Sequence, residues 1–313
     1  MKRTVAIGIQ DFSTLREQNC FYIDKTYFIK EWWESKDHTT LITRPRRFGK
    51  TLNMSMLECF FSVDYSGRGD LFHELSIWED RKYQDIQGTW PLISLSFANI
   101  KEPDFPKTSY RIRQILMKQY EKYSFLKTGD LLSDAEKKYF DNMASEMSEA
   151  DAPMALYQLS DYLHRYYGKK VIILLDEYDT PMQEAYINGF WDELMFFIRS
   201  FFNSTLKTNP WLERGLMTGI TRVSKESVFS DLNHLEVVTT TSDKYADSFG
   251  FTEAEVFSAL DEFMLSREKE TVKYWYDGFI FGKYRDIYNP WSILNFLDKK
   301  HMQPIGRIQA VMD

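Results

Sequence analysis

Residues 43–51, Thr-Arg-Pro-Arg-Arg-Phe-Gly-Lys-Thr, constrain the fold of this chain more than any other stretch. They follow a short apolar segment, Thr40–Ile42, and precede a segment with helical spacing, Leu52–Glu58. A strand, a loop with Gly-Lys-Thr and a helix form the layout of a phosphate-binding loop. In such a loop, backbone N–H groups at the helix N-terminus surround the phosphates. Lys50 neutralises their charge, and the Thr51 hydroxyl can hold Mg²⁺.

The loop is irregular, because Arg44 stands where the usual G-x-x-x-x-G-K-[ST] pattern has its first glycine. Three interpretations of its arginines stay open: they contact phosphates, pair with acids such as Asp179, or face solvent. Their place inside the loop favours at least one phosphate contact. The predicted nucleotide-binding residues are therefore Arg44, Arg46, Arg47, Phe48, Gly49, Lys50, Thr51 and Leu52. A glycine normally permits the tight turn at this position, and Arg44 must adopt an allowed backbone conformation instead. The loop is therefore expected to bind phosphates in a modified geometry, so the sequence supports nucleotide binding better than fast hydrolysis.

A second element of the same site is the apolar run Val171–Leu175, which ends in Asp176-Glu177. Unbroken β-branched runs are typical of a parallel strand covered on both faces. Asp176 is predicted to hold Mg²⁺ together with Thr51, and Glu177 to act as the catalytic base with Lys50 as its catalytic partner. A buried strand ending in solvated acids is the alternative, but the upstream Gly-Lys-Thr favours a nucleotide site.

The segment Gly215–Arg222 is a further predicted strand with a polar end. Thr218, Thr221 and Arg222 can lie near the terminal phosphate. We favour Arg222 as a catalytic charge sensor that stabilises the transferred phosphoryl group. A surface ion pair is an equally weighted role for Arg222.

Strands alternating with helices predict an α/β P-loop NTPase whose mostly parallel sheet is flanked by helices. Trp90–Phe97 is a further predicted strand, whereas residues 107–167 and Trp191–Phe202 are predicted to be mainly helical. This domain is expected to span residues 1–240. A smaller helical lid is expected over residues 241–304, with a helix start at Thr252.

Composition narrows the function classes only slightly. The chain has 313 residues, 43% of them hydrophobic, and a net charge of −7, which gives no argument for nucleic-acid binding. Its two cysteines show no metal-type spacing and suit a reducing compartment. No signal peptide or membrane span is apparent, so we expect a cytoplasmic protein without membrane contact.

The chain resembles the bacterial AAA-ATPase-like family. The matching segments are Phe21–Thr26, Arg44–Thr51, Leu175–Pro181, Thr218–Ser227, Phe249–Glu255 and Trp275–Phe279. The resemblance covers residues 5–303 and makes the arginine-rich loop part of the family's own pattern. It implies an ATP-binding core with a helical lid, commonly followed by a nuclease-like domain of the PD-(D/E)XK type.

The chain departs from the resembled family near its end. After Leu297-Asp298, such members continue with Tyr-Trp-Ala-Asn-Thr-Ser-Ser-Asn and the nuclease-like domain. The DNA series T-ATT-GGG-CGA-ATA-CAA-GCA-GTA-ATG encodes Ile305–Met312, and from its first T it encodes the family's sequence. We therefore expect residues 305–313 to be a poorly packed, out-of-frame tail and the downstream domain to be lost.

Together these features predict an ATP-binding protein that uses Mg²⁺. ATP hydrolysis is expected to drive or gate a C-terminal effector, nuclease-like in relatives. The alternative is a nucleotide-gated regulatory module with little or no turnover. Contact with nucleic acid through the missing domain and homo-oligomer formation both stay open.

Overall fold

The computed structural model describes residues 3–222, 229 and 234–301. The helices are α1 (Phe12–Glu17), α2 (Tyr27–Ser35), α3 (Lys50–Phe61), α4 (Arg81–Ile86), α5 (Phe105–Lys122), α6 (Asp134–Ser145), α7 (Ala155–Tyr167), α8 (Thr180–Asn188), α9 (Trp191–Phe202), α10 (Glu253–Glu262), α11 (Lys269–Tyr276) and α12 (Pro290–Lys299). The strands are β1 (Thr39–Thr43), β2 (Leu92–Ser96), β3 (Val171–Asp176), β4 (Leu212–Gly219), β5 (Leu235–Val238), β6 (Phe251–Thr252), β7 (Phe279–Phe281) and β8 (Tyr284–Tyr288).

The central element is a five-stranded sheet in the order β2-β3-β4-β1-β5, in which every neighbouring pair is parallel. Parallel strands need crossover connections, and the helices between the strands supply them. Thr43 pairs with Gly219 and Ser96 with Asp176, so the carboxyl ends of the central strands lie at one edge of the sheet. The predicted parallel α/β architecture is confirmed.

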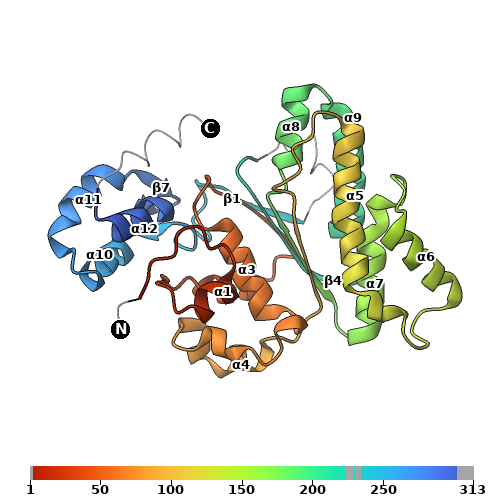
Figure 1. The fold of residues 1–313 in the computed structure, drawn as a ribbon, viewed down its shortest axis with the longest axis horizontal. Coiled ribbons are helices and arrows are strands. Elements are labelled where there is room, and N and C mark those ends of the chain that lie inside the picture. The colour runs from red at the N-terminus through yellow and green to blue at the C-terminus, as the bar shows by residue number, and fades with distance from the viewer. Residues whose placement is uncertain (1–2, 223–228, 230–233, 302–313) are drawn as a thin grey trace.

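Helices cover both faces of this sheet (Figure 1). One apolar core joins the sheet to α5, α6, α7 and α9, through buried residues such as Leu116, Phe140 and Leu159. The other joins it to α1–α3, through residues such as Phe12 and Phe60. Burial of a Leu or Phe side chain stabilises the folded state by about 1.5–3 kcal/mol. Because helices cover both faces of the sheet, every residue of β3 is buried, which explains its unbroken apolar run.

Residues 245–299, here called the small unit, lie beside the sheet on the side of its carboxyl ends (Figure 1). The predicted helices are present as α10, α11 and α12, and the predicted capping box at Thr252 with Glu255 starts α10. The small unit also contains an antiparallel sheet, β6-β8-β7, which we did not predict. Its strands are only 2, 3 and 5 residues long, too short for the alternation of a strand to stand out in the sequence.

Some predictions fall on residues that the structure does not describe. The expected out-of-frame tail, residues 305–313, lies outside the described residues, as do Ser224 and Ser227 of the Thr218–Ser227 motif. The domain boundaries at residues 240 and 304 stay predictions.

Candidate nucleotide-binding site

The phosphate-loop motif lies between β1 and α3, as its sequence predicts. Gly49 caps α3 in the left-handed conformation, with φ of 82°. Its carbonyl accepts a hydrogen bond from Asn53 N at 2.9 Å, which closes the first turn of the helix. Glycine adopts this conformation at no steric cost, so the loop can turn directly into α3.

Lys50 is buried, and its ammonium group folds back on the loop. Its Nζ donates to the carbonyl oxygens of Arg44 and Pro45, at 2.9 Å each. Burial lowers the pKa of Lys50, and the nearby carboxylates of Asp176 and Glu177 act in the opposite direction. The Lys50 side chain therefore holds the backbone of the loop through two hydrogen bonds, and its ammonium group lies near the carboxylates at the end of β3.

Asp176 joins three neighbouring segments at the end of β3. Its Oδ2 accepts from the Thr51 hydroxyl at 2.7 Å, its Oδ1 accepts from the backbone N–H of Glu177 at 3.0 Å, and Oδ1 also accepts from the Thr218 hydroxyl. The carboxylate is thus held by groups from α3, from the turn after β3 and from β4, and Asp176 is buried.

Thr51 and Asp176 offer the donor set that Mg²⁺ prefers. A hydroxyl and a carboxylate are hard oxygen ligands, and Mg²⁺ in nucleotide sites is commonly held by one or two protein groups plus water and phosphate oxygens. Among the described residues, no group of three or more His, Cys, Asp or Glu could hold a metal on its own. The residues fit a metal that arrives with a phosphate ligand, rather than a closed protein cage.

Glu177 lies at the turn after β3 with φ of 50°, which is uncommon for a residue other than glycine. Its Oε2 accepts from the Thr180 hydroxyl at 3.3 Å, and its side chain lines a pocket at this edge of the sheet. A strained backbone that presents a carboxylate to a pocket is a feature of functional sites.

Asp179 accepts several hydrogen bonds from the end of β4. Its Oδ2 accepts from the backbone N–H groups of Ile220 and Thr221, at 3.0 and 2.8 Å, and from the Thr221 hydroxyl at 2.7 Å. Gln183 donates to the same oxygen at 3.0 Å. This buried carboxylate ties the turn after β3 to the end of β4.

We expect Asp179→Ala to lower the free energy of unfolding by about 3 kcal/mol, because it leaves buried donors without an acceptor. The Gln183→Ala control removes only one of the four hydrogen bonds and should cost about 1 kcal/mol. Urea unfolding followed by circular dichroism measures both. Equal midpoints for Asp179→Ala and the parent would contradict this role.

The pocket has a volume of about 450 Å³ and contains most of the predicted nucleotide-binding residues. Arg46, Arg47, Gly49, Lys50, Thr51, Leu52 and Glu177 all line it. The lining also includes residues that the motifs did not predict: Lys101, Gln183, Glu184 and Trp291, and the N-terminal residues Gly8, Ile9 and Gln10. Lys101 follows β2, and a search for polar residues after every predicted strand would have found it.

Four predicted site residues do not line this pocket: Asp176, which is hydrogen-bonded to the lining residue Thr51, and Arg44, Phe48 and Arg222. Arg44 and Phe48 are buried, with 0 and 1% of their surface exposed, and neither lines the 450 Å³ pocket. Arg222 is exposed beyond the end of β4 and is also absent from the lining. Of the three loop arginines, Arg46 and Arg47 therefore have access to a phosphate in this state, and Arg44 does not.

An apolar recess of about 80 Å³ adjoins the pocket and shares Ala6, Ile9, Gly49 and Leu294 with its lining. A dry cavity of about 150 Å³ is known to hold benzene, so this recess does not enclose a nucleotide base in the present state.

A parallel sheet with Gly-Lys-Thr after β1 and Asp-Glu after β3 defines the P-loop NTPase-like class. The chain belongs to the AAA-ATPase-like family, described as "Predicted AAA-ATPase", which matches residues 6–229. The chain is also similar to an "Uncharacterized protein in vnfD 5'region" of Azotobacter chroococcum mcd 1. The two are 25% identical over 306 residues, or 97% of this chain and 53% of the relative. The chain thus spans about half the length of that curated relative.

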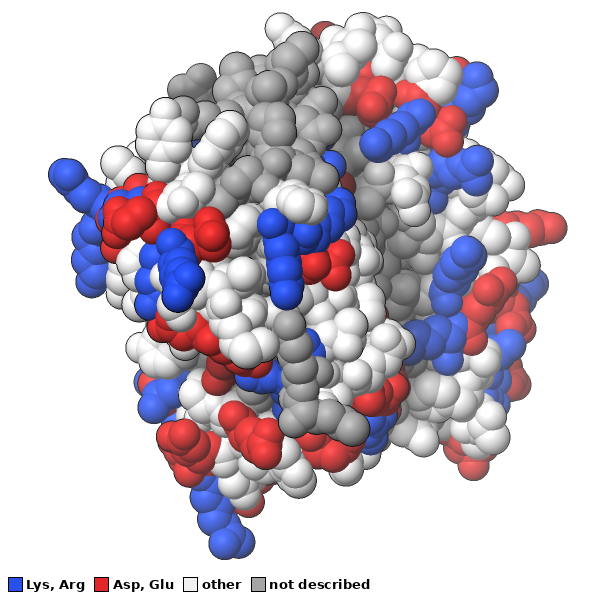
Figure 2. Space-filling view, turned by 60° about the vertical axis from the view of Figure 1, so that its left-hand side comes forward, with Lys and Arg blue, Asp and Glu red and all other residues white. Residues whose placement is uncertain are grey.

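The described helices and surface charges bear on membrane and nucleic-acid partners. None of the described helices is long and apolar enough to cross a membrane. On the face turned forward in Figure 2, the described Lys and Arg residues are interspersed with Asp and Glu. Double-stranded nucleic acid is usually bound by a continuous basic stripe, which the described part of this face does not show.

Proposed function

We propose that the protein binds MgATP in the 450 Å³ pocket and hydrolyses it. The observation that carries the proposal is the hydrogen bond of 2.7 Å between Thr51 and Asp176, because it brings the end of the loop motif and the acidic strand end together. Family membership supports nucleotide binding. A cytoplasmic location, where ATP and Mg²⁺ are abundant, suits this function.

In the proposed mechanism, Lys50 and the backbone N–H groups at the start of α3 hold the β- and γ-phosphates. Lys50 must exchange the carbonyl oxygens of Arg44 and Pro45 for phosphate oxygens. Mg²⁺, held through Thr51 and Asp176, would neutralise charge on the phosphate oxygens. Arg46 and Arg47 add positive charge at the mouth of the pocket.

Glu177 then orients the attacking water and accepts its proton. Arg222 is kept as a proposed charge sensor, and it needs a movement toward the pocket to act. Because Arg222 is exposed in the isolated chain, it can also serve the site of a second copy in a homo-oligomer.

The site is tested by Lys50→Ala. Loss of a charge-assisted contact to phosphate should weaken MgATP binding by about 10- to 100-fold. Isothermal titration calorimetry measures the affinity. The matched control is Lys82→Ala on α4, an exposed lysine paired with Glu34, which should bind as the parent does. A Lys50→Ala variant that keeps the parent's affinity would exclude this site.

A nucleotide-gated module with little turnover is the second candidate. The burial of Arg44 and Phe48 favours this candidate. Both side chains belong to the loop but pack inside the protein, so neither is available to contact a bound nucleotide. In both cases we propose that the nucleotide state acts on a C-terminal effector, nuclease-like in relatives. Turnover measured with and without DNA separates the two: stimulation supports a DNA-linked enzyme, and binding without turnover supports the module.

A further inference from the structure

The stretch Arg44–Phe48 has two sides with different partners. Its backbone faces the predicted phosphate site, because the carbonyl oxygens of Arg44 and Pro45 hold Lys50 Nζ. Its buried side chains contact the small unit instead. Phosphate loops usually have small residues here, which leave the backbone free to approach a ligand. Large side chains with a common partner at this place call for a separate explanation.

Arg44 contacts the small unit by both polar and aromatic groups. Its Nη2 donates to the carbonyl of Tyr245 at 3.2 Å. Its guanidinium carbon lies 4.9 Å from the ring centroid of Phe281 and 5.5 Å from that of Phe249, within cation–π range. Burial lowers the pKa of Arg44 to about 10, so the group stays charged at neutral pH. Arg44 is thus a charged anchor held by ring faces and carbonyl oxygens.

Phe48 forms an apolar cluster with the small unit. The cluster comprises Phe48, Ala246, Phe281 and Ile287, with Phe279 packed against it. The ring centroid of Phe48 lies 4.8 Å from that of Phe279 and 5.2 Å from that of Phe281. A Cβ added to Gly250 would come within 3.0 Å of the Phe48 ring and 2.6 Å of Ile287, so the chain passes closely behind the ring. Phe48 is the loop's contribution to a core that otherwise belongs to the small unit.

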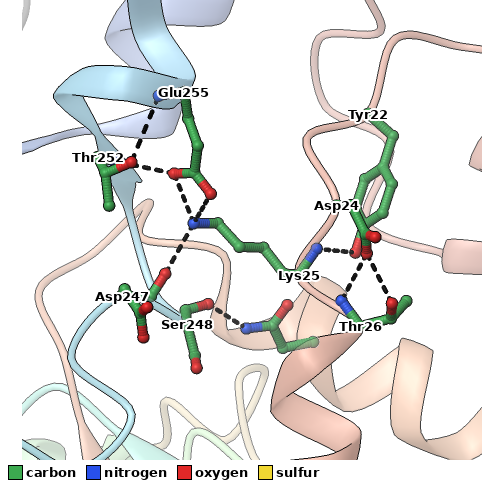
Figure 3. A network of polar contacts seen from close by, with 9 residues as sticks. Tyr22, Asp24, Lys25, Thr26, Asp247, Ser248, Thr252 and Glu255 are labelled. Atoms are coloured by element: carbon green, nitrogen blue, oxygen red, sulfur yellow. Dashed lines mark hydrogen bonds and ion pairs between the residues drawn. The ribbon is translucent and has the colours of Figure 1, made fainter. Parts of the chain in front are cut away.

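Separate contacts hold the small unit in place beside the loop (Figure 3). Lys25 Nζ donates to both carboxylate oxygens of Glu255, at 2.6 and 2.7 Å, and to the carbonyl of Asp247 at 2.7 Å. Glu255 also accepts from Thr252 N at 2.7 Å, so the ion pair is attached to the start of α10. This joins the Phe21–Thr26 and Phe249–Glu255 motifs, which the proposed chemistry does not use.

One contact of the loop lies inside the pocket. The guanidinium carbon of Arg47 is 4.0 Å from the ring centroid of Trp291, and both residues line the 450 Å³ pocket. Trp291 belongs to α12 of the small unit. A phosphate bound by the loop would therefore meet an arginine that already contacts the small unit.

We propose that Arg44 and Phe48 are positioning residues that make triphosphate binding depend on the small unit. They fix the backbone of residues 44–48 against Phe249, Phe279 and Phe281, and that backbone places Lys50. The inference rests on the proposed function, because it assumes that the loop binds a triphosphate. Coupling of this kind is reciprocal, so a bound triphosphate must also stabilise the contact between loop and small unit.

The test uses Phe281→Leu, which changes the far side of the contact without altering any residue that lines the pocket. We expect inorganic tripolyphosphate and MgATP to bind about 5- to 20-fold more weakly than to the parent. The matched control is Phe296→Leu, a buried residue of the small unit that packs on Tyr276 and belongs to a different apolar cluster from Phe48. It should keep the parent's affinity within about twofold.

Two measurements separate positioning from general destabilisation. Urea unfolding shows which variants are folded under the binding conditions. Hydrogen exchange of residues 279–288 should slow when tripolyphosphate is added to the parent, and slow less in Phe281→Leu. Arg44→Lys, which keeps the charge, should retain more affinity than Arg44→Met.

The outcomes distinguish the positioning role of Arg44 and Phe48 from the proposed ATP site itself. Equal affinities for the parent and folded Phe281→Leu, or hydrogen exchange unchanged by tripolyphosphate, would overturn the positioning role and leave the proposed ATP site intact. A parent that binds neither tripolyphosphate nor MgATP would remove the proposed function, and this inference with it. Equal losses in Phe281→Leu and Phe296→Leu would assign the effect to the fold of the small unit in general.

Discussion

Replacement of Glu177 by glutamine is expected to reduce ATP turnover by about 100- to 10,000-fold, because an amide cannot accept the proton of the attacking water. Binding of MgATP should stay near the parent's value. Glu177 lines the pocket, but the groups proposed to hold the phosphates are on the loop and α3. Steady-state phosphate release measures the turnover, and calorimetry measures the binding.

A matched control for this change is Thr180→Ala. It removes the hydroxyl that contacts Glu177 Oε2 at 3.3 Å but keeps the carboxylate, so the loss should be about tenfold or less. Glu177→Asn is informative for another reason. Asparagine tolerates the positive φ of 50° at this position, so this variant should fold normally and be as inactive as the glutamine variant. Unchanged turnover in both amide variants would assign the base to another group.

The central fold was predictable because its elements have strong local signals. The apolar run at Val171–Leu175, the Gly-Lys-Thr helix start and the helical spacing of Trp191–Phe202 correspond to β3, α3 and α9. β5 (Leu235–Val238) was not predicted. Only four residues long, it depends on pairing with β1, which is almost 200 residues earlier in the chain. Such a strand is determined by its partner more than by its own residues.

The candidate site was predictable where a residue lies at or near the carboxyl end of a strand. Thr51, Asp176 and Thr218 come together because the carboxyl ends of neighbouring parallel strands share one edge, as β3 and β4 do. The role of Arg44 was not predictable in the same way. An arginine in a phosphate loop suggests an anion as its partner, but Phe249 and Phe281 lie more than 200 residues away in the sequence. Only the three-dimensional contact shows that they surround it.

The dependence of turnover on Mg²⁺ tests whether Asp176 is a metal ligand. We expect Asp176→Asn to raise the half-saturating Mg²⁺ concentration for turnover by about 10- to 100-fold, because the neutral amide is a poor ligand and cannot accept all the present hydrogen bonds. The amide can accept through one atom only, whereas the carboxylate now accepts from Thr51, Thr218 and Glu177 N through two. Tripolyphosphate binding without Mg²⁺ should change little, since Lys50 is untouched.

The control for Asp176→Asn is Thr218→Val, which deletes one of these hydrogen bonds and keeps the metal-binding carboxylate. If Asp176 acts through its charge, Thr218→Val should respond to Mg²⁺ nearly as the parent does. If Asp176 acts only as a structural link between α3, β3 and β4, the two variants should instead lose stability together and keep the parent's Mg²⁺ dependence. A titration of turnover against Mg²⁺, combined with urea unfolding of both variants, distinguishes a metal ligand from a buried structural carboxylate.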